Sequence, residues 1–212
     1  MNRLVKKVIQ NSLNSIVTVQ ELALLEPGSD NIRHALVKRA IADGDLLHIK
    51  RGLYCLSPLY RKNPIHPFAL AQHIYGPSYI SLETALSAHG WIPEAVRTIT
   101  CVSAKAPREF PTVFGLFSYE RIPQNTLYAG VVLVRNENGQ TWMMASALKA
   151  LADYVHIHKL DWNSTEPIIE SLRVEKEQLL ELTSGDFEAL EDNYPGRRVR
   201  RFLAGLKKEL RL

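Results

Sequence analysis

The chain has 212 residues and a net charge of +4, with 46% hydrophobic and 23% charged residues. This balance is typical of a protein with a buried core and excludes a disordered chain. There is no run of about 18 apolar residues and no signal-peptide segment, so we expect no membrane contact and a cytoplasmic protein. The only cysteines, Cys55 and Cys101, argue against a disulfide framework or a zinc site.

Charge is distributed unevenly along the chain. Residues 1–60 hold 8 Lys or Arg and 5 Asp or Glu, and residues 61–143 hold 7 and 5. Residues 144–196 hold 4 basic residues against 11 acidic ones, whereas residues 197–212 hold 7 against 1. This pattern indicates separate surfaces for different partners, although a solvated acidic helix face is an equally simple interpretation.

The first 28 residues predict two helices and a turn. The apolar pattern of residues 2–13 predicts a helix. Its expected buried side chains are Leu4, Val5, Val8 and Ile9. Thr18 and Glu21 have the spacing of a capping box, so a second helix is expected to begin there and to run to Leu25. Pro27-Gly28 then predicts a turn.

A third helix is expected between Ser29 and Gly44. Ser29 can accept hydrogen bonds from the amides of the first turn, and Gly44 can end the helix in a left-handed conformation. The residues at a spacing of four predict the buried stripe, which consists of Ile32, Leu36 and Ala40. The opposite face carries Asn31, Arg33, His34, Val37 and Lys38.

Two short strands, residues 46–49 and 53–56, follow this helix. Between them, Lys50-Arg51-Gly52 predicts a tight turn with two cations at its tip. A helix with a basic, amide-bearing face followed by a basic hairpin is typical of a winged helix-turn-helix, so residues 1–60 are predicted to be a DNA-binding domain. The alternative is a small α+β domain whose basic residues are merely solvated.

Residues 61–212 predict a larger mixed α+β domain that ends in helices, with the boundary near residues 57–65. Expected helices are 67–75, which Gly76 ends, and 82–89, which Ser81 caps and Gly90 ends. Expected strands are 96–103, 112–121, 130–135 and 140–144. Asn138-Gly139 predicts a hairpin between the last two strands.

From residue 145 onward the pattern is helical. One helix is expected to bury Ala147, Leu148, Leu151 and Val155, and a second to bury Ile168, Ile169, Leu172, Leu179 and Leu182. Residues 186–191 predict a short helix. Pro195 is expected to begin the last helix, where a missing amide proton is tolerated. Its apolar stripe would be Val199, Phe202, Leu203, Leu206 and Leu210.

Several sequence motifs, which follow one another in the same order as in the family, resemble the AbiE-type antitoxins. These are bacterial transcriptional regulators of type IV toxin–antitoxin (abortive-infection) operons. The motifs are Lys50-Arg51-Gly52-Leu53-Tyr54, the block Tyr79-Ile-Ser-Leu-Glu-Thr-Ala-Leu-Ser-Ala-His-Gly-Trp-Ile-Pro93, Phe114-Gly-Leu-Phe-Ser-Tyr119 with Ile122-Pro123, and Ala145-Ser-Ala-Leu-Lys-Ala-Leu-Ala-Asp153. The resemblance covers residues 15–160. The family often has Glu where this chain has Leu148, so a family ion pair at that position is not carried over.

The resemblance implies a role as well as a fold. The N-terminal domain would bind double-stranded DNA at inverted repeats in the protein's own promoter and repress transcription, as a monomer in solution or a dimer on DNA. The C-terminal domain would counter a cognate nucleotidyltransferase toxin, and a stable complex with that toxin is not required. No catalytic role and no cofactor are implied.

Candidate DNA-binding residues follow from their chemistry. Arg suits guanine and Asn suits adenine, because each can form a pair of hydrogen bonds with the base edge. The candidates for the major groove are Asn31, Arg33, His34 and Lys38. Lys50 and Arg51 are expected to contact phosphate, and Arg39, nearer the buried stripe, is expected to pair with an acid. The simpler alternative is that all of these are solvated.

The basic C-terminal helix allows three interpretations. It can pack as an amphipathic helix with a solvated face, add DNA contacts, or dock an acidic partner or a second copy of the chain. The residues available for such contacts are Arg197, Arg198, Arg201 and Lys208. Its apolar stripe needs a cover in each case.

The sequence does not favour an enzyme. It has no nucleophile elbow, no ligand cluster with metal spacing and no glycine-rich phosphate loop. Ser81 is explained as a helix cap, His89 as a residue that complements a helix dipole, and His156-Ile-His158 is a weak metal pattern. Two alternatives remain: a ligand-responsive winged-helix transcription factor, favoured by an apolar pocket within residues 65–145, and a subunit that binds the toxin directly.

Overall fold

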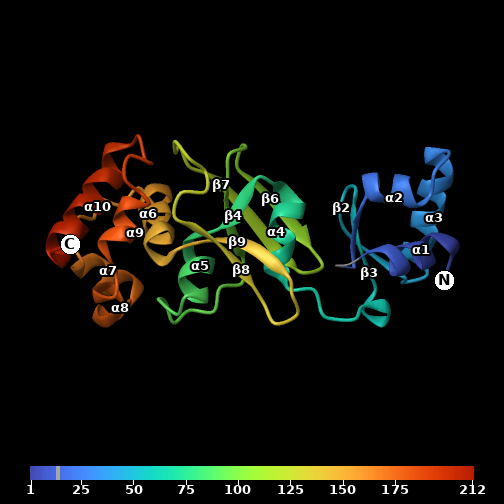
Figure 1. Ribbon diagram of the computed structural model, residues 1–212, viewed down its shortest axis with the longest axis horizontal. Helices are drawn as coiled ribbons and strands as arrows, with labels where there is room; N and C mark the ends of the chain where they lie inside the picture. Colours follow the sequence, from blue (N-terminus) through green and yellow to red (C-terminus); the bar gives the residue numbers. More distant parts are fainter. Residues whose placement is uncertain (13–14) are drawn as a thin grey trace.

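The computed structural model describes residues 1–12 and 15–212 and has a mixed α+β fold with two sheets (Figure 1). We call residues 1–60 the head and residues 61–212 the body. The head lies at one end of an elongated molecule, with α3 on its outer side and its sheet facing the body (Figure 1). The C-terminal helices form the opposite end.

The head consists of three helices and a small antiparallel sheet. In chain order the elements are α1 (Arg3–Asn11), β1 (Ile16–Thr18), α2 (Val19–Leu25), α3 (Asp30–Ala42), β2 (Leu46–Lys50) and β3 (Leu53–Leu56). The strand order is β1-β3-β2, and the central strand pairs Cys55 with both Ile16 and Leu47. A short 3₁₀ helix, η1 (Pro58–Tyr60), leads out of the head.

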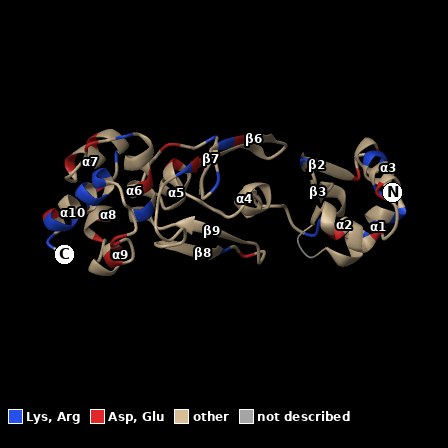
Figure 2. Ribbon diagram, turned by 90° about the horizontal axis from the view of Figure 1, so that it is seen from above, with Lys and Arg blue, Asp and Glu red and all other residues tan. Residues whose placement is uncertain are grey.

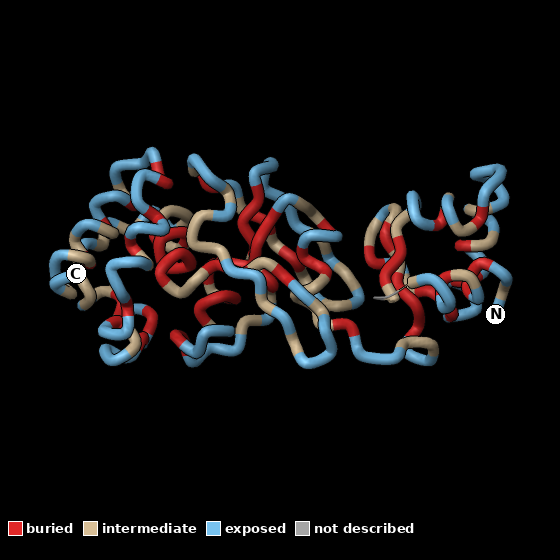
Figure 3. Tube along the Cα trace, in the orientation of Figure 1, coloured by how far each residue is buried: buried red, intermediate tan, exposed pale blue. Residues whose placement is uncertain are grey.

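The head sheet buries both of its faces. Side chains alternate along each strand, so neighbouring residues face opposite sides of the sheet. Val17, Leu46 and Leu56 belong to the apolar cluster formed with the three head helices. Ile16, Ile49, Leu53 and Cys55 belong instead to the larger cluster that fills the body. The body's apolar core therefore continues across residue 60 onto the head sheet, and burial in Figure 3 is dense along these strands.

The body is built on a six-stranded sheet with the order β6-β7-β5-β4-β9-β8. Its strands are β4 (Ser78–Ile80), β5 (Ile99–Ser103), β6 (Arg108–Thr112), β7 (Gly115–Arg121), β8 (Val131–Arg135) and β9 (Thr141–Ala145). The β4–β9 and β5–β7 pairs are parallel, and the other pairs are antiparallel.

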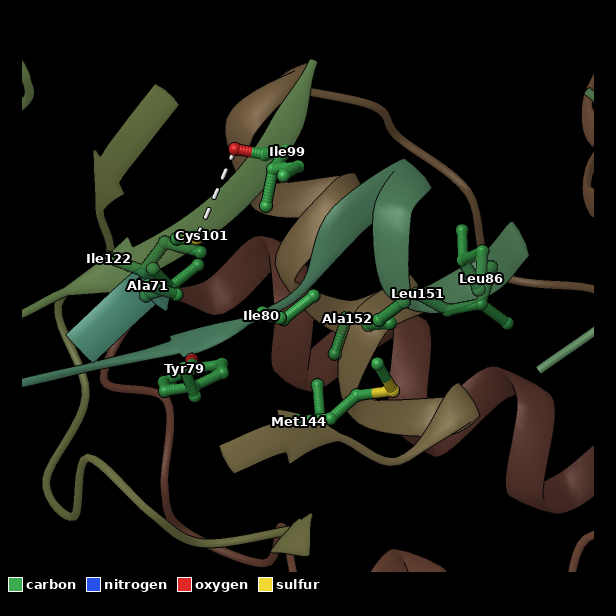
Figure 4. Packing of buried hydrophobic residues seen from close by; sticks show 14 of the residues in the cluster. Ala71, Tyr79, Ile80, Leu86, Ile99, Cys101, Ile122, Met144, Leu151 and Ala152 are labelled. Carbon is green, nitrogen blue, oxygen red and sulfur yellow. Dashed lines mark hydrogen bonds between the residues drawn. The ribbon is translucent and has the colours of Figure 1, made fainter. Parts of the chain in front are cut away.

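Helices cover this sheet and extend the body away from the head. They are α4 (Pro67–Tyr75), α5 (Leu82–Ala88), α6 (Ala147–Ile157), α7 (Glu166–Leu172), α8 (Lys176–Leu180), α9 (Ser184–Glu188) and α10 (Arg197–Leu210). Helix α4 contacts β4, β5, β7 and β9, whereas α5 packs on α6 and α10 packs on α6 and α9. Figure 4 shows Ile80 and its strand partner Met144 beside Leu151 and Ala152 of α6.

Several local predictions are confirmed. Thr18 and Glu21 form the capping box at the start of α2, which runs to Leu25. Gly44 follows α3 with φ at +72°, in the left-handed region. The predicted hairpin at Asn138-Gly139 joins β8 to β9. Gly139 has φ at +76°, which the tight turn requires and glycine adopts readily.

The predicted buried stripe of α3 is wrong. Ile32 is 52% exposed and Leu36 is half-buried, whereas Val37, which was expected on the open face, is 6% exposed. The stripe is rotated because the neighbouring elements cover the side of α3 that carries Val37 and Ala40. Ile9 of α1 was also expected to be buried and is 36% exposed. The predicted first helix extended to residue 13, which lies outside the described residues.

Other differences concern where elements break. The expected strand 112–121 corresponds to β7, which begins only at Gly115, because Thr112 ends the preceding strand β6. The expected strand 96–103 begins only at Ile99. The single helix expected over residues 168–182 is two helices, because Arg173 ends α7 with φ at +57°. The last helix begins at Arg197 after Gly196, and not at Pro195. Strand β1 was not predicted, since three residues carry too little pattern.

Two predicted caps do not form through their side chains. Ser29 and Ser81 stand at the N-cap positions of α3 and α5, but neither hydroxyl accepts a hydrogen bond from the first turn. The backbone carbonyl of Ser29 accepts bonds from Ile32 and Arg33 instead. Within residues 1–12 and 15–212, no helix combines the length and the apolar character that crossing a membrane requires.

Candidate nucleic-acid interface

The outer surface of α3 carries an exposed row of polar and basic side chains. Asn31, His34, Lys38 and Arg39 are all exposed. Asn31, His34 and Lys38 recur at spacings of three and four residues and so share one side of the helix, and Arg39 lies at the edge of that side. Arg39, which was expected to pair with an acid, has no carboxylate partner among the described residues. This row offers two amide or imidazole groups and two cations to a partner.

Arg33 is used within the head. Its Nη1 donates to the carbonyl of Glu26 at 3.0 Å and to that of Gly28 at 2.8 Å, and its Nη2 pairs with Asp30. The side chain is only 14% exposed. The guanidinium therefore ties the α2–α3 turn to the first turn of α3, and the structure does not bring it into the exposed row.

A small pocket lies between α3, α2 and β3. His34 and Val37 from α3 line it together with Tyr54 from β3 and Val19 from α2. The ring centroid of Tyr54 lies 5.6 Å from that of His48, its cross-strand partner on β2. Neither aromatic ring was singled out from the sequence. The register of β2 against β3, which short strands do not reveal, brings these two rings together.

The turn between β2 and β3 separates the two cations predicted at its tip. Arg51 is exposed, and Gly52 has φ at +80°. Lys50 is half-buried, its Nζ donates to the carbonyl of Ile74 in α4, and it lies 5.6 Å from the centre of the Phe110 ring. Burial lowers the pKa of Lys50, and two nearby cations of the body lower it further. Lys50 therefore joins head to body, and Arg51 alone remains open at the turn.

The basic helix α10 lies far from this surface. Figure 2 shows α3 and α10 at opposite ends of the molecule. Arg198 and Arg201 flank Asp161, at 3.7 and 3.1 Å, whereas Arg197 and Lys208 are exposed. The stripe of α10 is covered, with Val199, Phe202 and Leu206 fully buried. The packed amphipathic helix is therefore the interpretation that fits its apolar face, and its outer cations form a separate basic surface.

The body contains a second polar centre, buried between α6, β4 and the loop before α10. Lys149 and Asp153 of α6 both have no exposed side-chain surface. The Lys149 ammonium donates to Gln124 Oε1 at 2.6 Å and to the Tyr194 hydroxyl at 2.8 Å. The Asp153 carboxylate accepts from Tyr79 at 2.9 Å, from Tyr194 at 2.6 Å and from Ser81 at 2.7 Å. Ser81 thus serves this centre instead of capping α5.

The charges of this centre are matched inside the protein. Burial lowers the pKa of Lys149, and Asp153 opposes that shift by favouring the charged ammonium. Burial also raises the pKa of the Tyr79 and Tyr194 phenols well above the usual value, and the Asp153 carboxylate adds to it. Both charged groups therefore have close hydrogen-bond partners within the protein, which a buried ion pair requires.

The residues that could suggest an enzyme are placed elsewhere. His89 caps α5, and its Nε2 lies 2.8 Å from the carbonyl of Ala145. His158 Nε2 lies 3.1 Å from Glu83 Oε1, and burial lowers the pKa of His156. Across the described ranges, no group of three His, Cys, Asp or Glu side chains is close enough to hold a metal ion.

Comparison with known proteins gives no assignment. No family model matches this chain, and no curated protein matches its sequence.

Proposed function

We propose that the protein is a DNA-binding transcriptional regulator whose head is a winged helix-turn-helix. The observation that carries the proposal is the order α1-β1-α2-α3-β2-β3 with the sheet order β1-β3-β2, combined with an exposed polar row on α3. In that class of domain the second helix of the helix-turn-helix lies in the major groove, and the hairpin contacts the backbone.

In this proposal α3 enters the major groove. Asn31, His34 and Lys38 are the residues that read base edges, because all three are exposed on one side of the helix. Arg51 binds a phosphate from the β2–β3 turn. Arg33 positions α3 through its bonds to the preceding turn and contacts no base.

The role in the cell is proposed from the resemblance. The protein represses its own promoter and acts as the antitoxin of a type IV toxin–antitoxin system, with the body countering a nucleotidyltransferase toxin. The wing motif lies in the head, and the blocks at residues 79–93 and 145–153 lie in the body. We therefore assign repression to the head and toxin neutralisation to the body.

DNA binding is tested by electrophoretic mobility shift with the DNA upstream of the protein's own gene, over a range of salt concentrations. We expect binding that weakens as salt rises. Lys38→Ala and Asn31→Ala should each weaken specific binding by about tenfold, and Lys176→Ala, an exposed lysine of α8, should leave it unchanged. Full-strength binding by both head variants would contradict the proposed interface.

The antitoxin role is tested separately by growth. The nucleotidyltransferase encoded beside the gene is expressed alone and together with this protein. We expect growth arrest in the first case and recovery in the second. Lys38→Ala should still restore growth when it is expressed from a foreign promoter, because neutralisation is assigned to the body. Arrest that the wild-type protein does not relieve would contradict the antitoxin role while leaving DNA binding intact.

A further inference from the structure

The six-stranded sheet of the body has two edge strands, β6 and β8, which Figure 2 shows on opposite sides of the body. Strand β6 carries Arg108, Glu109 and Pro111, which are the residue types that keep an edge strand from pairing with another chain. Strand β8 reads Val131-Val-Leu-Val-Arg135, with no proline and no charge before Arg135. The β8 edge therefore lacks the protection that the β6 edge has.

Strand β8 exposes apolar side chains on both of its faces. Leu133 is 66% exposed, and its neighbour Val132 is also exposed. Because side chains alternate along a strand, these two lie on opposite faces of the sheet. A run of exposed, mostly β-branched residues at an open edge favours pairing with a further strand. Such a strand would cover apolar surface on each face of β8.

The hydrogen bonds at the two ends of the β8–β9 pair show which backbone groups of β8 are used. The Asn136 amide donates to the Gln140 carbonyl at 3.0 Å, and the Ser146 amide donates to the Gly130 carbonyl at 2.8 Å. In an antiparallel pair the hydrogen-bonded residues alternate with residues that are not hydrogen-bonded. The even-numbered residues of β8 therefore bond to β9, and the odd-numbered ones direct their backbone groups away from the sheet.

The outward-directed groups belong to Val131, Leu133 and Arg135. The Val131 amide donates to the Tyr128 carbonyl at 3.1 Å, so only its carbonyl is free. Within residues 1–12 and 15–212, the amide and carbonyl groups of Leu133 and Arg135 have no backbone partner on that side, because β8 pairs with β9 alone. The edge thus offers two free amides and three free carbonyls to a strand beside it.

We propose that β8 pairs with β8 of a second copy of this chain, antiparallel about a twofold axis at Leu133. In this register the two Leu133 residues exchange both of their backbone hydrogen bonds. Each Arg135 amide donates to the partner's Val131 carbonyl, which makes two further bonds. The Val131 amide, which is already used within the chain, is not needed. The pairing joins two six-stranded sheets into one continuous sheet.

A second copy fits this edge because the strand matches itself. About the same axis, Leu133 lies opposite the partner's Leu133 and Val132 lies opposite the partner's Val134, so apolar side chains meet on both faces. The two Arg135 side chains lie at opposite ends of the paired strands, where they do not repel each other. A strand of five residues covers less than the area of about 1,000 Å² expected of a stable interface, so the dimer forms reversibly.

The first test is sedimentation velocity of the full-length protein over a wide range of concentrations, without DNA. We expect wild-type dimers whose fraction rises with concentration. Leu133→Lys should raise the dimer dissociation constant by about tenfold or more, because like charges directly opposite each other on paired strands repel. Leu133 is exposed, so the variant should fold as the wild type does. The control is Val113→Lys, which adds the same charge at a 61% exposed position between β6 and β7 and should leave dimerisation unchanged.

The second test places a thiol at the twofold axis. The Cα atoms of a hydrogen-bonded antiparallel pair lie about 5.5 Å apart, so Leu133→Cys brings two thiols together in the dimer. A short bismaleimide should cross-link this variant much faster than Val113→Cys. The native Cys55 and Cys101 are both buried and should not react.

Two results would overturn pairing through β8: equal cross-linking rates for the two cysteine variants, or a Leu133→Lys variant that dimerises like the wild type. A wild-type chain that stays monomeric at every concentration would overturn the second copy as the partner, and so would a different protein that shields the Leu133→Cys thiol in its place. The inference goes beyond the proposed function and is tested without DNA. Failure to shift DNA would therefore overturn the proposed function and leave the dimer standing.

Discussion

The Lys149 ammonium lies 3.2 Å from the Asp153 carboxylate, one helical turn away, and neither side chain has any exposed surface. Spacing of four residues places the two on the same side of α6. The pair tolerates burial because other groups complete its hydrogen bonding: the Tyr79 hydroxyl from β4, the Gln124 amide from the loop after β7 and the Tyr194 hydroxyl from the loop before α10. It therefore connects the sheet, α6 and the C-terminal segment through one set of contacts.

Breaking this pair should destabilise the protein strongly. Lys149→Met leaves the Asp153 carboxylate buried without its cation, and we expect a loss of about 3–5 kcal/mol in the free energy of unfolding. The double variant Lys149→Met/Asp153→Leu should cost less than the sum of the two single variants, because no unpaired charge remains. Urea unfolding measures all three. Additive losses would show that the pair is not coupled.

Alkaline pH should unfold the protein through buried tyrosines. Burial raises the pKa of Tyr79, Tyr119 and Tyr194 above the ordinary value of 10.0. Above that pH the unfolded chain loses phenolic protons that the folded chain keeps, so these groups' contribution to stability is fully present below pH 10 and declines as the pH rises. Circular dichroism and tyrosinate absorbance should change together. Ionisation of all tyrosines without unfolding would contradict this expectation.

Arg33 and Lys38 should separate stability from binding within α3. Arg33→Ala removes the donors from two backbone carbonyls and should lower the free energy of unfolding by about 1–3 kcal/mol. Lys38→Ala removes an exposed cation and should leave the stability within about 0.5 kcal/mol of the wild type while weakening DNA binding. Thermal unfolding and mobility shift are measured on both variants. Arg39→Ala, at an exposed position of the same helix, is the matched stability control.

The sequence predicts well wherever the signal is local. The capping box of Thr18 and Glu21 and the turn at Asn138-Gly139 depend on neighbouring residues, and both form as expected. The buried face of α3 depends on which elements pack against it. The predicted stripe ran through Ile32, whereas the stripe that is buried runs through Val37. A spacing of four is compatible with either face.

The candidate site was only partly predicted, because some of its side chains contact segments that are distant in the sequence. The polarity of Asn31 and Lys38 predicts that they are exposed. Polarity does not predict that Arg33 and Lys50 donate hydrogen bonds to backbone carbonyls instead. Each of these contacts joins α3 or β2 to a different segment. Lys149 and Asp153 illustrate the limit most clearly, because their partners lie up to 74 residues away and composition suggests nothing about them.

Gly205 should tolerate no side chain although it lies inside a helix. Helix propensity alone predicts that Gly205→Ala would stabilise α10 by about 1 kcal/mol. A Cβ at this position would collide with the backbone carbonyl oxygen of Asn163, which cannot rotate away as a side chain can. Accommodating it would push α10 from the loop before α7, and we expect a net loss of about 1–3 kcal/mol. The measurement is urea unfolding. The control is Ala204→Gly at the exposed neighbouring position, which should lose about 1 kcal/mol from helix propensity alone. A gain in stability for Gly205→Ala would show that α10 and this loop are not in close contact.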